Sequence, residues 1–208
     1  MMMRLLAAAG LGATVLAGCA APQRLMTADE AAAATHRTFK GVSTEQAVSA
    51  AERVLWLADG DDFAIDRERD GLMATRNWTV YFLLGFVTGT DQWIVKARPV
   101  EGGTDVTFAV GSVAQPAGAR ITPRRDGDPR PRVMGSMHEG TAIYDLVWAR
   151  MAYLLGQRDT WMSCAESDAR VNAGVVWGGT AALCNSFNVK DQVPDGPMVG
   201  KAVGEISQ

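Results

Sequence analysis

The feature that most limits the fold of this chain is a series of short alternating stretches between residues 62 and 113. In each stretch an apolar side chain occupies every second position, as Trp93, Val95 and Ala97 do. Turn sequences such as Asp70-Gly71 separate the stretches, because Asp-Gly tolerates positive φ. The pattern is typical of antiparallel hairpins with one buried face and one face in water. The stretches are 62–67, 72–82, 92–100 and 104–113.

Two helix-start signals flank these stretches. Ser43-Thr44-Glu45-Gln46 and Ser136-Met137-His138-Glu139 both have the spacing of a capping box. The first predicts a helix that runs to about Ala58 before a stop at Gly60. The second predicts a helix that ends at Gly156. Its apolar positions at helical spacing are Tyr144, Val147, Trp148, Met151 and Leu155.

Together with a first strand at 36–40, these elements predict an α+β domain over residues 36–157. We expect an antiparallel sheet of about four to five strands with two helices packed on one face. Residues 85–91 are expected to turn the chain, and the run "YFLLGFVTG" at 81–89 to form a buried strand and turn. Periodicity fades after Gln157, so 158–208 is expected to be irregular, with a flexible end from residue 189 onward.

The cysteines Cys164 and Cys184 favour a disulfide bond. Apart from Cys19 near the N-terminus, they are the two cysteines of the chain. If the chain is exported to an oxidising compartment, such a remaining pair is expected to form a disulfide. The bond would pin the irregular C-terminal segment. The alternatives are two free buried thiols, or a nucleophilic Cys164 that needs a base brought near it by the fold.

The N-terminus has the composition of an export signal. Arg4 precedes an uncharged run over 5–18, which is shorter than the about 20 apolar residues of a transmembrane helix and fits the apolar part of a signal peptide. The quartet Leu16-Ala17-Gly18-Cys19 resembles the lipobox of bacterial lipoproteins. This resemblance implies a signal peptide over 1–18, acylation of Cys19 and a lipidated tether over 19–35. The alternatives are a signal peptide cut elsewhere and an N-terminal helix with a chance cysteine.

The residue after Cys19 bears on the membrane to which the chain goes. Ala20 stands where Gram-negative lipoproteins that stay in the inner membrane usually have Asp. The resemblance therefore implies the periplasmic face of the outer membrane. Two or more acyl chains make such anchoring stable, at about 0.8 kcal/mol per buried CH₂. Within the tether, 28–34 is rich in Ala and favours a short helix.

Candidate catalytic and metal-ligating residues are few. The histidines His36 and His138 have no carboxylate, Cys or second His at ligand spacing, whereas zinc needs several converging ligands. His138 and Glu139 are adjacent, and adjacent residues point to different sides of a helix. We interpret them as a surface pair in a first helical turn. We expect no catalytic residue, no metal and no cofactor.

A loop over 114–133 is rich in Pro, Gly and Arg. It is a candidate for contact with anionic lipid headgroups or with an acidic partner. Asp126 and Asp128 dilute its positive charge, so the alternative is a solvated loop. The formal net charge of the whole chain is −3, which gives no general attraction to nucleic acid. The arginines of this loop are Arg120, Arg124, Arg125, Arg130 and Arg132.

These features predict a membrane-anchored periplasmic lipoprotein, not an enzyme, that binds or scaffolds within the bacterial cell envelope. The expected partners are membrane lipid, through the acylated Cys19, and another envelope protein. The lipobox and the element order are similar in outline to BamC-type components of the outer-membrane assembly machinery. The first alternative is a carrier of a small apolar ligand or lipid, which predicts a sizeable apolar cavity between the sheet and the two helices. An envelope enzyme ranks last.

Overall fold

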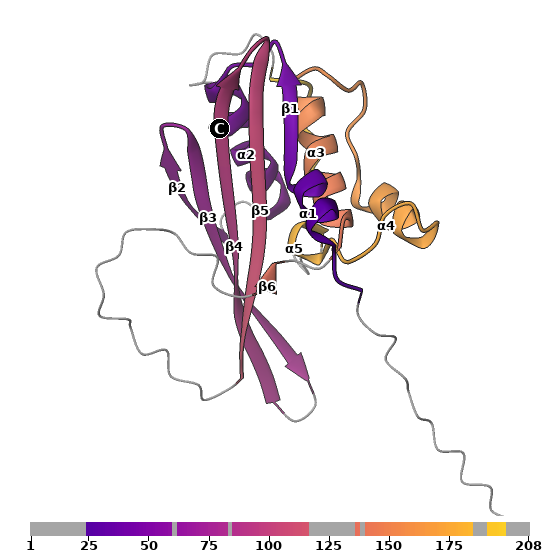
Figure 1. Cartoon of the computed structure of the whole chain (residues 1–208). Helices are drawn as coiled ribbons and strands as arrows, with labels where there is room; N and C mark the ends of the chain where they lie inside the picture. The colour runs from indigo at the N-terminus through magenta and orange to yellow at the C-terminus, as the bar shows by residue number, and fades with distance from the viewer. Residues whose placement is uncertain are drawn as a thin grey trace, which may run out of the picture.

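The computed structural model of the chain describes residues 24–59, 62–82, 85–116, 136–137, 140–184 and 191–198. Five strands form one antiparallel sheet in the order β1-β5-β4-β3-β2, and the short β6 pairs with β5 (Figure 1). The α+β fold class that the sequence predicts is confirmed. The strands are β1 (His36–Lys40), β2 (Phe63–Glu68), β3 (Gly71–Phe82), β4 (Gly85–Val100), β5 (Gly103–Pro116) and β6 (Ser136–Met137). The helices are α1 (Ala28–Thr35), α2 (Thr44–Asp59), α3 (Ala142–Leu154), α4 (Cys164–Asn172) and α5 (Ala181–Cys184).

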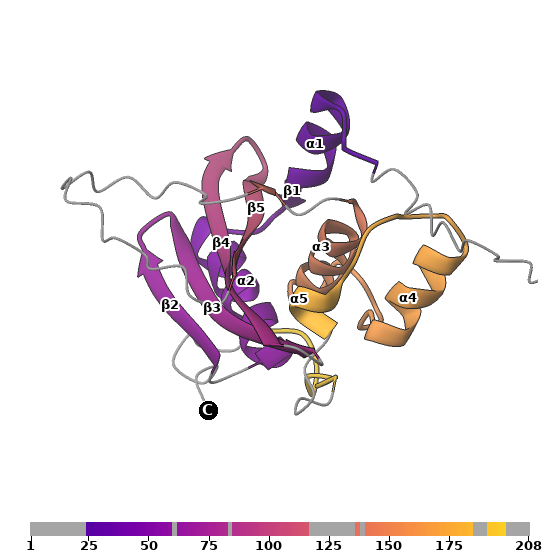
Figure 2. The same ribbon diagram turned by 90° about the horizontal axis from the view of Figure 1, so that it is seen from below.

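Helices α2 and α3 lie on one face of the sheet, and the core fills the space between the two layers (Figure 2). A row of buried aromatic rings crosses this core. The ring centroids are 6.0 Å apart for Phe63 and Trp93, 5.7 Å for Trp93 and Phe108, and 5.7 Å for Phe108 and Trp148. These rings connect the edge strand β2 and the inner strands β4 and β5 to α3, because Trp148 is a helix residue and the other three come from these strands.

Helix α2 begins where the sequence predicts. The amide of Ser43 donates to Oε1 of Gln46 at 2.9 Å, and the amide of Gln46 donates to Oγ of Ser43 at 3.2 Å. This reciprocal pair satisfies two backbone amides that a helix start leaves unpaired. The face that turns toward the sheet is fully buried and consists of Ala47, Ala50, Ala51, Val54 and Leu55.

The second predicted helix start is wrong. Ser136 and Met137 form β6 and pair with β5, so their backbone groups are satisfied by the sheet. Gly140 follows with a positive φ of 111° and bridges to Gly178, and α3 begins only at Ala142. The apolar face expected for this helix is confirmed, since Tyr144, Val147, Trp148 and Met151 are buried. His138 and Glu139 lie outside the described residues.

The turn predicted at 85–91 is wrong, because these residues belong to β4. Strand β3 pairs with β4 along its whole length, from Gly71 opposite Lys96 to Phe82 opposite Gly85. Their far end projects beyond the helices as a long hairpin (Figure 1). The expectation of a buried apolar run is also wrong, since Tyr81 is 79% exposed there. Hydrogen bonding of the two backbones stabilises this pairing even where no helix covers the side chains.

The C-terminal segment contains more order than its sequence suggests. Cys164 and Cys184 form the predicted disulfide, with Cα atoms 5.6 Å apart. Between them lies the unpredicted helix α4, which Ser163 caps by accepting from the amide of Glu166 at 3.0 Å. The sequence predicts a flexible end from residue 189, and within it the amide of Met198 donates to the carbonyl of Leu154 at 2.7 Å.

A buried arginine holds this segment to α3. Arg150 is 1% exposed and donates to Asp191 at 2.8 Å and to the carbonyl of Met162 at 3.1 Å. Its guanidinium also lies over the ring of Trp161, at 4.7 Å from the centroid. Burial lowers the pKa of Arg150, and the carboxylate of Asp191 opposes that shift. The ion pair therefore fixes the last described segment against the helix layer.

The short helix expected at 28–34 is confirmed as α1. Thr27 and Glu30 form its capping box, and Trp148 donates from its indole nitrogen to the carbonyl of Ala34 at 2.6 Å. The chain then passes directly from α1 into β1. The segment that precedes the sheet is thus hydrogen-bonded to α3 before the sheet begins.

Candidate functional site

The residues singled out from the sequence fall into two groups. Cys164 and Cys184 are joined and therefore serve as a covalent brace. The predicted lipidation site Cys19 and the predicted headgroup-contact arginines lie outside the described residues. Those arginines are Arg120, Arg124, Arg125, Arg130 and Arg132.

The described residues contain neither a cluster of metal ligands nor a helix that could span a membrane. Within the ranges that the structure describes, no three side chains of His, Cys, Asp or Glu gather as metal ligands. No helix in that part of the chain is long and apolar enough to cross a membrane. The candidate site described next is a surface groove.

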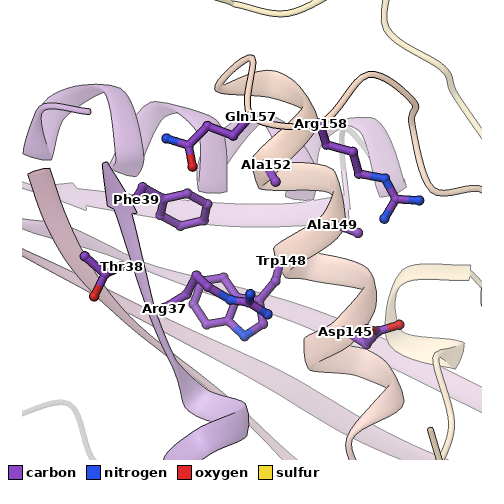
Figure 3. Close-up of a pocket in the computed structure, with 9 residues that line it drawn as sticks. All are labelled: Arg37, Thr38, Phe39, Asp145, Trp148, Ala149, Ala152, Gln157 and Arg158. Atoms are coloured by element: carbon purple, nitrogen blue, oxygen red, sulfur yellow. The ribbon is translucent and has the colours of Figure 1, made fainter. Parts of the chain in front are cut away.

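An open groove of about 360 Å³ lies between β1 and α3 (Figure 3). It brings together residues about a hundred positions apart in the sequence. Strand β1 supplies one wall, and α3 with the turn after it supplies the other. The lining residues are Arg37, Thr38, Phe39, Asp145, Trp148, Ala149, Ala152, Gln157 and Arg158.

Two aromatic side chains form the apolar floor of this groove. Arg37 and Phe39 point from β1 toward α3, whereas Thr38 points to the other side of the strand (Figure 3). This alternation follows from the strand period of two. Phe39 is 2% exposed, and its ring centroid lies 6.1 Å from that of Trp148. The floor is therefore rigid and shared between strand and helix.

Charged side chains surround the floor, and most of them are held by α4. Asp145 accepts two hydrogen bonds from Arg170, at 2.8 and 3.1 Å. Arg158 donates to Glu166 at 2.9 Å. Arg37 is exposed and has no ion-pair partner among the described residues. The rim of the groove thus offers an arginine to an incoming anionic group.

Strand β1 is also an edge of the sheet. It pairs with β5 on one side and has no strand partner on the other side among the described strands. The carbonyl of Lys40 points to that outer side, because it accepts from Nε2 of Gln157 at 2.8 Å. In an antiparallel pair, backbone groups that face outward recur at every second residue. Thr38 therefore presents its N–H and its C=O at the outer edge, beside the groove.

Sequence reasoning missed this site. The stretch "HRTFK" at 36–40 indicates a short strand, but nothing in it shows which strand lies beside it. The other wall of the groove comes from α3, and only the tertiary packing brings the two together. The one local signal is the shortness and positive charge of the strand, which are common at sheet edges.

Large aromatic side chains lie in the layer between the sheet and the two helices. Between the sheet and the two helices lie the fully buried side chains of Trp93, Phe108 and Tyr144. These residues belong to the continuous core of the described chain.

Known proteins were compared with this chain by family, by sequence and by structure. No protein-family model, no curated protein and no solved structure matches it significantly.

Proposed function

We propose that the chain is a lipid-anchored, non-catalytic binding component of the bacterial cell envelope. In this proposal the acylated Cys19 holds it at the periplasmic face of the outer membrane. The groove beside β1 receives an extended segment of another envelope protein. The lipobox supports the anchor, and the open edge of β1 supports the binding role.

The observation that supports the binding role is that the open edge of β1 lies beside a groove. An extended segment that adds to a sheet edge forms backbone hydrogen bonds with that edge, and every second side chain enters a neighbouring pocket. Here the N–H and C=O of Thr38 would pair with the segment. The floor of Phe39 and Trp148 would receive an apolar side chain, and Arg37 would receive an acidic one.

Binding at the edge of β1 is tested by comparing how much partner is recovered with the variants Thr38→Pro and Thr38→Val. Proline removes the outward N–H and is tolerated at a sheet edge, whereas valine keeps the N–H and the branched shape. We expect the partner recovered from detergent-solubilised envelopes with the Thr38→Val chain to be lost with Thr38→Pro. Both variants should unfold at the same temperature as the parent chain. Equal recovery by the two variants would contradict binding at this edge.

The anchor is tested separately by the intact mass of the protein purified from membranes. We expect the mature chain to begin at Cys19 and to carry acyl chains. The variant Cys19→Ser should leave the membrane fraction. An unmodified thiol on a chain that does not sediment with membranes would remove the lipoprotein part of the proposal.

A further inference from the structure

The hairpin of β3 and β4 ends in an apolar tip, formed by Val80, Tyr81, Phe86 and Val87. Tyr81 is 79% exposed, Val80 57% and Phe86 44%. Val80 and Tyr81 are consecutive, so they point to opposite faces of the strand. Because both are exposed, neither face of the hairpin is covered at this end. The rings of Tyr81 and Phe86 lie together across the two strands, with centroids 6.1 Å apart.

The polarity of the hairpin is graded along its length. The tip residues pair with each other, Tyr81 with Phe86 and Val80 with Val87. The next pair toward the body is Thr79 with Thr88, and charge first appears at Arg76 and Asp91. No charged residue occurs in the sequence between those two positions. The hairpin therefore has an apolar end with aromatic rings, followed by the hydroxyl groups of Thr79 and Thr88. This order of groups suits the boundary between acyl chains and headgroups.

An acylated Cys19 would keep the first described residues close to the membrane. If Cys19 is acylated, Arg24 lies within about 18 Å of the bilayer, since five extended residues reach no farther. Figure 1 shows that the first described residues and the hairpin tip leave the body at the same end. Figure 2 views the molecule from that end. Leu25, within the tether, is itself 67% exposed.

We propose that the tip of the β3–β4 hairpin inserts into the surface of the bilayer that holds the lipid anchor. This proposal rests on the proposed function, because the anchor at Cys19 sets which end of the molecule faces the membrane. Tyr81 and Phe86 enter the boundary region, and the hydroxyls of Thr79 and Thr88 remain among the headgroups. The tip and the acyl chains then fix the orientation of the domain, because each contact restrains a different point of it.

The test is photocrosslinking of the full acylated chain in its own membrane. The tip variant is Tyr81→p-benzoylphenylalanine. The control is Val100→p-benzoylphenylalanine, at an exposed apolar residue at the other end of β4, about 50 Å away by strand rise. We expect phospholipid adducts at position 81 in at least tenfold excess over position 100. Adducts with protein only, equal lipid adducts at both positions, or no adduct at position 81 would overturn the proposal.

A second measurement separates this proposal from the lipid anchor. The mature Cys19→Ser chain is mixed with vesicles of phosphatidylethanolamine and phosphatidylglycerol. Replacing Tyr81 and Phe86 together by Ser should weaken binding about tenfold or more, because the buried apolar area is lost. Replacing the exposed Val100 and Val175 by Ser should change it less than about twofold. An acylated native chain whose tip substitutions have no effect would overturn the insertion alone. A native chain without acyl groups would overturn the proposed function.

Discussion

Two buried arginines, Arg76 and Arg150, lie beside carboxylates at opposite parts of the core. Asp91 accepts from Arg76 at 3.1 Å, from the indole nitrogen of Trp78 at 3.0 Å and from Ser112 at 2.8 Å. Because Asp91 is 4% exposed, water cannot replace these partners without opening the sheet. This cluster marks the level at which the sheet leaves the helix layer and continues as a bare hairpin.

Removing this carboxylate should destabilise the fold strongly. We expect Asp91→Ala to lower the free energy of unfolding by about 3–5 kcal/mol, since it removes a buried carboxylate that accepts from Arg76, Trp78 and Ser112. Urea unfolding followed by tryptophan fluorescence measures the change. Glu68→Ala is the matched control, because Glu68 pairs with Lys96 at the surface, where the loss should stay below about 1 kcal/mol. Similar losses for the two variants would contradict the distinction.

A single glycine also limits the hairpin. A Cβ added at Gly89 would lie 2.1 Å from the ring of Trp78 and 2.6 Å from the carbonyl oxygen of Val113. Gly89→Ala should therefore lower the unfolding free energy by about 1–3 kcal/mol and change the near-ultraviolet circular dichroism of Trp78. Gly179→Ala is the control, because nothing lies within 4 Å of the added atom. Unchanged stability of the Gly89 variant would show that the ring moves aside freely.

Among the elements, the disulfide and the Arg150–Asp191 ion pair meet at Cys164, because Arg150 donates to its Sγ at 3.3 Å and its amide donates to Asp191 at 2.6 Å. Cys164 and Cys184 are separated by 20 residues. Closing a loop of that size is expected to stabilise the fold by about 3 kcal/mol. The double variant Cys164→Ser with Cys184→Ser should therefore unfold at lower urea concentration. Adding reductant to the parent chain should give the same shift, and a parent chain insensitive to reductant would contradict the estimate.

The segment 191–198 is held more locally. Asp191→Asn removes the negative charge beside Arg150 and keeps the size of the side chain. Hydrogen exchange of the Met198 amide, which donates to Leu154, should become at least about tenfold faster, because opening this segment becomes cheaper. Asp195→Asn, with its exposed side chain in the same segment, should leave the rate unchanged. Equal rates in the two variants would show that the ion pair does not hold the segment.

The same local signal succeeded at Ser43 and failed at Ser136, and the reason lies outside the signal. At Ser43 the backbone amides are free to form the helix cap. At Ser136 the backbone pairs with strand β5 instead. Likewise Gly85 and Gly89 suggest a turn. Gly89 instead lies within β4, where the absence of a side chain leaves room for the ring of Trp78 on the paired strand. The fold class was predictable because it follows from local periodicity. The groove was not, because it requires β1 and α3 to lie side by side.

For the whole molecule, the two proposed contacts make different demands on the tether. The groove beside β1 needs only access to a partner, whereas the hairpin tip needs to be held near the bilayer. A flexible Gly-Ser insert of about 20 residues between Ala20 and Arg24 would add a root-mean-square reach of about 25 Å. It should reduce lipid adducts at position 81 several-fold, because effective concentration falls with linker length. Partner recovery through the groove should not change. Loss of both would show that they share one surface.

The direct passage from α1 into β1 has a mechanical consequence. Strand β1 follows α1 without a break, and it runs antiparallel to β5 over five residue pairs (Figure 1). A pull on the N-terminus therefore acts along the axis of β1 and loads those pairs together in shear, instead of opening them one after another. Before the force reaches them, it meets the bond from Trp148 to Ala34. A domain loaded in this way resists unfolding by a pull on its N-terminus.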